Sequence, residues 1–263
     1  MSHLEQKIYL ILESEGKSVF TVEELKKLNL PIKYGHLRVL LHRMEKKGWL
    51  TSVRKGVYLR LPAVAAVEGK AYLEDPFLVA LKVFDGYLAF QSALKVHGLS
   101  EYQTFTVFVA TRNKSDSLKF LKWYEIKAIK LGKRYVGYIK KNNYKVSSAA
   151  KTFFDCFYHP QYAGGYSEVL KSLHACREMD WGEFLSYFKK FASNSLCQKV
   201  GYLLTLLKET DYKVPNGVIK YLKERVCVKT RLDPNMPGGK LDKDWLVVDN
   251  FGKKELLSWW LHG

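Results

Sequence analysis

The sequence lacks any long apolar run. No stretch approaches the roughly 20 apolar residues that a membrane-spanning helix needs. The first residues, from Met1 to Glu5, open directly into an amphipathic pattern without a basic-then-apolar leader. We therefore expect a cytoplasmic protein that has no membrane partner.

Cysteines are few and far apart, at spacings of 20, 21 and 30 residues along the chain. No close pair exists of the kind that zinc ribbons and redox motifs use, so reduced and mostly buried thiols are expected. The pairs Cys156 with His159 and His174 with Cys176 offer four ligands for zinc, but the second pair is too tightly spaced for ordinary finger geometry. The sequence predicts neither a metal nor a cofactor.

Motifs of common enzyme classes are also missing. There is no Gly-x-Ser-x-Gly segment, and Gly164-Gly165 and Gly238-Gly239 lack the setting of a phosphate-binding loop. Asp242 and Asp244 have the spacing of metal-binding carboxylates but lie in a polar stretch, so we expect them to face solvent. These observations predict a protein that is not an enzyme.

Acidic residues are scarce relative to basic ones. Forty-three Lys and Arg against 26 Asp and Glu leave a net charge of +17, a field that attracts polyanions. Residues 1–62 hold 12 basic and 6 acidic side chains, hence +6, and the remainder carries +11. Nucleic acid is the favoured partner, and 263 residues with 47% apolar content suffice for two modest domains.

The first 30 residues predict two helices in quick succession. The first has apolar residues at helical spacing and ends near Gly16. The second begins with Thr21 and Glu24 in the spacing of a capping box. It ends at the segment Asn29-Leu30-Pro31. The apolar face of the first helix consists of Leu4, Ile8, Ile11 and Leu12, and that of the second of Val22, Leu25 and Leu28.

A third helix, from about Lys33 to Lys47, has two faces of different character. Its apolar arc, expected in the core, consists of Leu37, Leu40, Leu41 and Met44. The opposite arc has long donors on its flanks and a small residue near its N-terminal end, where a backbone can approach closely. This arc, which suits a major groove, consists of Gly35, Arg38, Val39, His42, Arg43 and Lys46.

Residue types on this arc suggest specific contacts with DNA. Arg38 and Arg43 carry guanidinium groups that fit guanine edges or phosphates, and Val39 fits a thymine methyl group. Lys46 fits a phosphate better. The alternatives are a basic face that contacts only solvent, or a face that contacts another protein instead of DNA.

Two strands follow, at Trp49–Val53 and Val57–Leu61, joined by the basic turn Arg54-Lys55-Gly56. Three helices followed by a strand hairpin is the element order of a winged helix, which makes double-stranded DNA the leading partner. Arg54 and Lys55 would lie at the tip of the wing, within reach of a minor groove or phosphates. Charges that merely keep a hairpin soluble are nearly as good an explanation.

The rest of the chain predicts a larger mixed domain. Small residues without a strong period indicate a linker over 63–75, and a domain over 76–263 follows. The expected fold class is α+β: a winged helix-turn-helix domain at 1–62, then a mixed α/β domain whose second half is rich in helix. The expected helices are 75–84, 89–97, 149–158, 166–176, 181–191, 196–208 and 218–225, and the expected strands 104–110, 123–130, 135–140, 227–232 and 245–248.

Several segments together resemble the AbiEi-type antitoxin family, predicted transcriptional regulators of type IV toxin–antitoxin systems. The resemblance spans nearly the whole chain, and it depends on the order and spacing of segments that are individually weak. Lys199 and Asp249 depart from the pattern expected of the family. The segments are 41–50 with 56–58, 150–156 with Gly164-Gly165, 199–204, and Leu232-Asp233-Pro234 before Trp245 and 248–250.

The resemblance implies a repressor that controls its own operon by binding inverted repeats through its N-terminal domain. It also implies a C-terminal domain that is needed to neutralise a toxin resembling a nucleotidyltransferase. Type IV antitoxins counter the effect of the toxin without a stable complex, so the resemblance implies a functional link and not a tight toxin contact.

A second basic surface is a further hypothesis for the C-terminal domain. Lys151 lies four residues before Asp155 on one predicted helix, which favours an intrahelical ion pair. The alternative is that Lys151 belongs to a basic surface that contacts DNA or RNA, interleaved with tyrosines; a solvated face explains the same pattern. The other residues of this candidate surface are Lys133, Arg134, Lys140 and Lys141.

Three functions remain open at this point. The favoured one is a DNA-binding repressor and antitoxin. The others are an RNA-directed binding module and an uncharacterised enzyme that processes nucleic acid.

Overall fold

We describe the fold from a computed structural model, which covers residues 2–28, 34–62, 73–101, 105–121 and 123–261. These residues form two compact units, one made of 1–87 with 104–130 and the other of 88–103 with 131–263. The chain therefore leaves the first unit and returns to it. The predicted boundaries at residues 62 and 76 stay a prediction, and most of the predicted linker falls outside the described residues.

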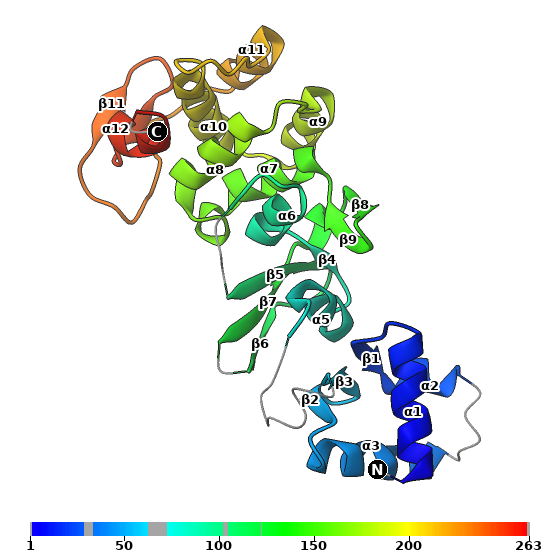
Figure 1. Ribbon diagram of the computed structural model, residues 1–263. Coiled ribbons are helices and arrows are strands. Elements are labelled where there is room, and N and C mark those ends of the chain that lie inside the picture. Colours follow the sequence, from blue (N-terminus) through cyan, green and yellow to red (C-terminus); the bar gives the residue numbers. More distant parts are fainter. Residues whose placement is uncertain (1, 29–33, 63–72, 102–104, 122, 262–263) are drawn as a thin grey trace. The chain divides into compact units, whose positions relative to one another are not determined.

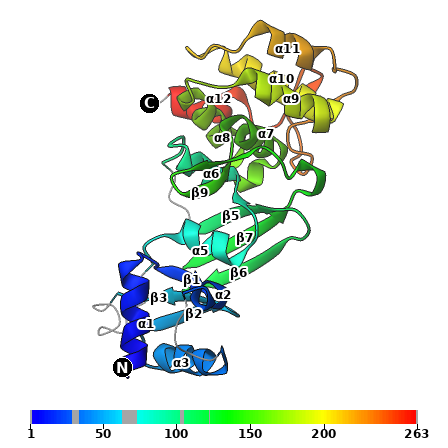
Figure 2. The same ribbon diagram turned by 90° about the vertical axis from the view of Figure 1, so that its right-hand side faces the viewer.

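The first unit begins with the winged helix that the sequence predicts. Strand β1 pairs with β3, and β3 with β2, all antiparallel, so the wing hairpin is extended by a third strand (Figure 2). The sequence did not predict β1, because three residues are too short to show a period. The elements are α1 (His3–Ser14), β1 (Val19–Thr21), α2 (Val22–Lys26), α3 (Tyr34–Lys46), β2 (Leu50–Arg54) and β3 (Val57–Arg60).

Local capping fixes where the first two helices start. The Ser2 hydroxyl accepts from the Glu5 amide, and the Glu5 carboxylate accepts from the Ser2 amide, which forms a capping box on α1. The capping box predicted for Thr21 and Glu24 is confirmed, with the Glu24 amide 3.1 Å from the Thr21 hydroxyl. The predicted end of the second helix, at residues 29–31, lies outside the described residues.

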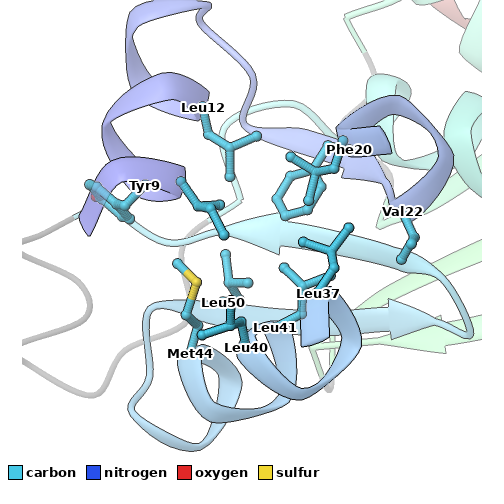
Figure 3. Close-up of a cluster of buried hydrophobic side chains, with 11 residues drawn as sticks. Tyr9, Leu12, Phe20, Val22, Leu37, Leu40, Leu41, Met44 and Leu50 are labelled. Carbon is cyan, nitrogen blue, oxygen red and sulfur yellow. The ribbon is translucent and has the colours of Figure 1, made fainter. Parts of the chain in front are cut away.

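One apolar cluster holds the winged helix together (Figure 3). Side chains of α1, β1, α3 and β2 point toward one another there, with Leu12, Leu41 and Met44 fully buried. Fully burying one such side chain stabilises the fold by about 1.5–3 kcal/mol. The four apolar residues that the sequence assigned to the core side of the third helix are all buried.

The remainder of the first unit is a small α/β layer. Helix α5 begins at its Asp75 cap and lies against β5 (Figure 1). Strand β5 pairs with β7 in parallel, and β6 pairs with β7 antiparallel. These elements are α5 (Pro76–Val83), β5 (Thr106–Thr111), β6 (Asp116–Phe120) and β7 (Tyr124–Lys130).

Mixed strands and short helices open the second unit. The boundary between the units falls within β4 (Tyr87–Leu88). Strand β9 pairs with β4 in parallel and with β8 antiparallel. The predicted strand at 135–140 begins later than expected, because residues 132–134 form a turn of 3-10 helix. The elements are α6 (Phe90–Val96), η1 (Gly132–Arg134), β8 (Tyr138–Lys141) and β9 (Tyr144–Ser147).

Helices dominate the remainder, as the sequence predicts, and α7, α8 and α10 lie side by side (Figure 1, Figure 2). Phenylalanines join α7 and α9, with the rings of Phe154 and Phe188 5.2 Å apart. The elements are α7 (Ala149–Tyr158), η2 (Pro160–Tyr162), α8 (Gly165–Ala175), α9 (Trp181–Phe191), α10 (Asn194–Leu207), α11 (Asn216–Lys223), β10 (Thr230–Arg231), β11 (Lys240–Asp242), β12 (Val247–Asp249), α12 (Lys253–Leu256) and α13 (Ser258–Leu261).

Candidate nucleic-acid interface

Helix α3 presents its polar arc to solvent, opposite the buried apolar stripe. Val39 is 48% exposed, so an aliphatic side chain faces solvent on this arc. Among the described residues, nothing beyond the adjoining turn of α3 lies within 4 Å of where a Cβ of Gly35 would stand, so this position allows a close approach. The six residues predicted for this arc, Gly35, Arg38, Val39, His42, Arg43 and Lys46, are all exposed.

One further exposed residue lies on this face and was not among those predicted. His36 is exposed and follows Gly35 on α3. At 100° per residue it lies 20° from Arg43 on the helical wheel, so the same periodicity would have found it. An imidazole at this place adds a donor beside a guanidinium group.

The wing is a tight hairpin whose tip is basic. Arg54 pairs with Val57, so Lys55 and Gly56 form the turn, and Gly56 has φ +82°. Positive φ at this place favours glycine, which explains why this turn contains one. Lys55 is exposed at the tip. The register of the hairpin shifts between Ser52 and Arg54, which adds a bulge near the tip.

Glu45 connects α3 with the wing. Its carboxylate accepts a hydrogen bond of 2.9 Å from the backbone amide of Ser52 on β2. The same side chain lies 3.9 Å from the His42 ring. Burial raises the pKa of the Tyr58 hydroxyl on β3, with Glu45 raising it further and Arg38 lowering it, so these three side chains are neighbours. The exposed face of α3 and the wing are therefore fixed to each other.

Arg54 is engaged within the first unit. Its guanidinium lies 3.3 Å from the Asp116 carboxylate on β6 and 5.3 Å from the centre of the Phe84 ring. The pair is exposed, so it contributes little to stability, and a phosphate can compete for the same guanidinium. A DNA contact by Arg54 stays a prediction, and it requires exchange of this partner.

The predicted C-terminal basic surface divides in the structure. Lys133 and Lys140 are exposed. Lys141 has its ammonium 3.3 Å from the His97 ring. Arg134 is half-buried, with its guanidinium 3.7 Å from the centre of the Tyr158 ring. Exposed cations thus remain at two of the five predicted positions, and a third is tied to an aromatic ring.

Lys151 is not part of any surface, and its assignment to a basic surface is wrong. The side chain is fully buried on α7, where its ammonium pairs with the equally buried Asp155 carboxylate. Burial lowers the pKa of Lys151 and raises the pKa of Asp155, while their mutual attraction opposes both shifts. The intrahelical pair favoured by the four-residue spacing is confirmed.

Other polar residues considered for chemistry are dispersed. The thiols of Cys156, Cys176 and Cys197 are buried and Cys227 is exposed, all unpaired. Among the described residues, no three His, Cys, Asp or Glu side chains lie close enough together to hold a metal ion. The Asp242 carboxylate accepts from the Trp245 amide, which makes it a turn cap, and Asp244 faces solvent. Within the described parts of the chain, no helix combines the length and apolar character needed to cross a bilayer.

Comparison with known families identifies the N-terminal segment. Residues 7–60 match the family model of AbiEi antitoxin transcriptional regulators, the family that the sequence resembles. This match supports a DNA-binding regulator.

Comparison with solved structures concerns the whole chain. The crystal structure of the RV2827C protein from Mycobacterium tuberculosis is 13% identical, with a TM-score of 0.68, and the match covers 98% of this chain and 94% of that one. At this identity the likeness establishes a shared fold. A search of curated proteins gives no match.

Proposed function

We propose that this chain, whose residues 7–60 match AbiEi antitoxin regulators, is a transcriptional repressor that controls its own operon as the antitoxin of a type IV toxin–antitoxin system. The observation that supports the proposal most is the exposed face of α3, opposite four buried apolar residues. A face with two arginines, a lysine, an exposed valine and an open glycine has the donors and the apolar contact that major-groove recognition requires.

In this proposal, α3 enters the major groove and the wing lies beside it. Arg38 and Arg43 contact guanine edges or phosphates, Lys46 contacts a phosphate, and Val39 contacts a thymine methyl group. Lys55 at the tip of the wing reaches the neighbouring backbone. The contact between Glu45 and Ser52 keeps these two elements at a fixed spacing.

Binding of labelled duplex from the region upstream of the gene tests the proposal. We expect Arg38→Ala and Arg43→Ala each to weaken specific binding by about 1–3 kcal/mol, measured by fluorescence anisotropy. Lys7→Ala removes an exposed cation on α1 and is the matched control, for which little change is expected. A reporter driven by the same region should be repressed by the wild type and not by Arg43→Ala. Equal affinity for unrelated duplexes would contradict the repressor proposal.

Neutralisation of a toxin is the second half of the proposal. We propose that the larger α/β part counters a nucleotidyltransferase-like toxin without a stable complex. Co-expression should rescue growth from such a toxin while the two proteins elute separately in size-exclusion chromatography. Growth arrest that persists with the full chain present contradicts the antitoxin role and leaves the repressor role intact.

RNA is the alternative partner for the second unit. Lys133 and Lys140 are exposed, and the Lys145 ammonium lies 4.3 Å from the centre of the exposed Tyr138 ring, an arrangement that suits stacked bases. Tighter binding to structured RNA than to any duplex DNA would favour this function. Metal-dependent turnover of an oligonucleotide, lost in Asp242→Ala, would favour an enzyme instead.

A further inference from the structure

Lys199 on α10 is the meeting point of three hollows in the second unit. The largest has a volume of about 650 Å³ and extends from the end of α7 to the segment after β10. The other two, of about 220 and 490 Å³, also have Lys199 in their walls. Cavities that bind small molecules are typically about 300–1,000 Å³. The three hollows share wall residues, Lys199 among them, and are named together the Lys199 cleft.

One branch of the Lys199 cleft is aromatic. Tyr158, Tyr166 and Phe251 line the largest hollow, and the rings of Tyr166 and Phe251 meet edge to face at 6.0 Å. Tyr158 is 37% exposed, and the Arg134 guanidinium holds its ring from one side at 3.7 Å. A partly exposed ring held in place by a cation is a platform on which a flat heterocycle can stack.

The other branch is cationic. Lys199, Lys229 and Arg231 line it together with Ser195, Thr230 and Pro234, and no carboxylate is among these residues. The Ser195 and Thr230 hydroxyls lie 2.7 Å apart. Two ammonium groups, one guanidinium and two hydroxyls at one hollow form a set of donors suited to phosphate oxygens.

Internal contacts hold Lys199 and Arg231 in position. The Lys199 ammonium donates to the Leu232 carbonyl at 3.0 Å, and an Arg231 guanidinium nitrogen donates to the Gly238 carbonyl at 2.9 Å. Side chains that are already ordered lose less conformational entropy when a ligand binds. The only carboxylate in the wall of the aromatic branch belongs to Asp233, which disfavours phosphate there and is suited to accept from sugar hydroxyls.

From this arrangement we propose that the Lys199 cleft binds a nucleoside 5′-phosphate. The base stacks in the aromatic branch on Tyr158 and Phe251, and the phosphate lies in the cationic branch against Lys199, Lys229 and Arg231. The proposal depends on the second unit alone, so it stands or falls independently of operator binding by the winged helix. Segments quoted for the family resemblance supply part of the wall, namely Gly165, Lys199, Leu232, Asp233 and Pro234.

Calorimetric titration of the full chain with adenosine 5′-monophosphate tests the proposal. We expect saturable binding of one molecule per chain, and weaker binding of both adenosine and inorganic phosphate, because each fills one branch only. Lys229→Gln/Arg231→Gln removes two exposed cations of the cleft and should weaken binding at least about tenfold. The matched control is Lys213→Gln/Lys220→Gln, which removes two exposed cations elsewhere in the same unit and should bind like the wild type.

Tyr158→Ala separates the two branches. It should weaken binding of the nucleotide more than binding of inorganic phosphate. A general loss of folding would not produce this difference. An equal loss of nucleotide affinity in the Lys213→Gln/Lys220→Gln control would show that net charge alone causes the effect, and would overturn the proposal. So would the absence of saturable binding for adenosine, guanosine, cytidine and uridine monophosphates alike.

A 5′-phosphorylated single-stranded oligonucleotide distinguishes the source of the ligand. Competition between this strand and the mononucleotide, lost in Lys229→Gln/Arg231→Gln, assigns the cleft to the end of a nucleic-acid strand. Failure of the strand to compete assigns it to a free nucleotide. Either result supports the shared chemistry of the site.

Discussion

At the scale of single residues, burial decides what a charge can do. Lys151 and Lys140 have the same side chain, yet Lys151 is fully buried against Asp155 and Lys140 is exposed on β8. Burial, together with the nearby charges of Arg134 and Lys151, lowers the pKa of His159 to about 4, so its imidazole is neutral near pH 7. The number of lysines and arginines counted from the sequence therefore overstates the basic surface of the second unit.

Removing Lys151 alone should be more harmful than removing the pair. We expect Lys151→Met to destabilise the protein by about 3–5 kcal/mol, because it leaves the Asp155 carboxylate buried without its partner. Lys151→Met/Asp155→Leu should recover much of that loss. Urea unfolding measures both, and a double variant that is as unstable as the single one would contradict the expectation.

The same variant should respond to pH in a defined direction. Burial raises the pKa of Asp155, and Lys151→Met removes the cation that opposes this shift. A carboxyl whose folded pKa is raised binds more protons in the folded state, so it stabilises the fold at low pH. The stability of Lys151→Met should therefore fall as the pH rises from the unfolded pKa of Asp155 toward its folded pKa.

At the scale of elements, the winged helix owes its shape to contacts between neighbouring pieces. Helix α3 and the wing are connected by Glu45, and the β1 strand extends the hairpin through its pairing with β3. The two faces of α3 follow from its local sequence. The position of the wing beside α3 depends instead on contacts between separate elements. Recognition of a groove together with its neighbouring backbone depends on both.

Glu45→Ala should loosen the wing relative to α3 without removing a basic side chain. We expect weaker operator binding with little change in the salt dependence, because no phosphate contact is lost and only the positioning suffers. Lys55→Ala, by contrast, should reduce the salt slope by about one phosphate contact. Anisotropy titrations at several salt concentrations separate the two variants, and identical slopes and affinities would contradict this role of Glu45.

At the scale of the whole molecule, net charge governs encounter with polyanions. A charge of +17 attracts any duplex, whereas in the proposed function the face of α3 discriminates between sequences. Both units contribute to this attraction, because the first holds 20 basic and 12 acidic residues (+8) and the second 23 and 14 (+9).

Charge removal in the second unit should therefore weaken binding to the operator and to unrelated duplex by the same factor. We expect Lys133→Gln/Lys140→Gln to weaken binding to unrelated duplex and to leave the ratio of specific to non-specific affinity nearly unchanged. Arg38→Ala should lower that ratio instead. Filter binding with operator and unrelated duplex measures both, and a lowered ratio for Lys133→Gln/Lys140→Gln would mean that the second unit also contacts the operator.

Features that depend on a few turns of chain follow from the sequence alone. The period of 3.6 residues assigned each side of α3, and the Thr21 capping box placed the start of α2, because side chains three and four apart meet on a helix whatever surrounds it. Resemblance of short segments likewise indicated the family that residues 7–60 match.

Only the tertiary structure decided features that join distant residues. The pairing of Val19 with Leu59, the contact between Arg54 and Asp116 and the convergence on Lys199 bring together residues 30 to 60 or more positions apart. The burial of Lys151 depends on packing between helices in the same way. Periodicity carries no information on these, because a local pattern specifies which face is apolar and not which distant segment will cover it.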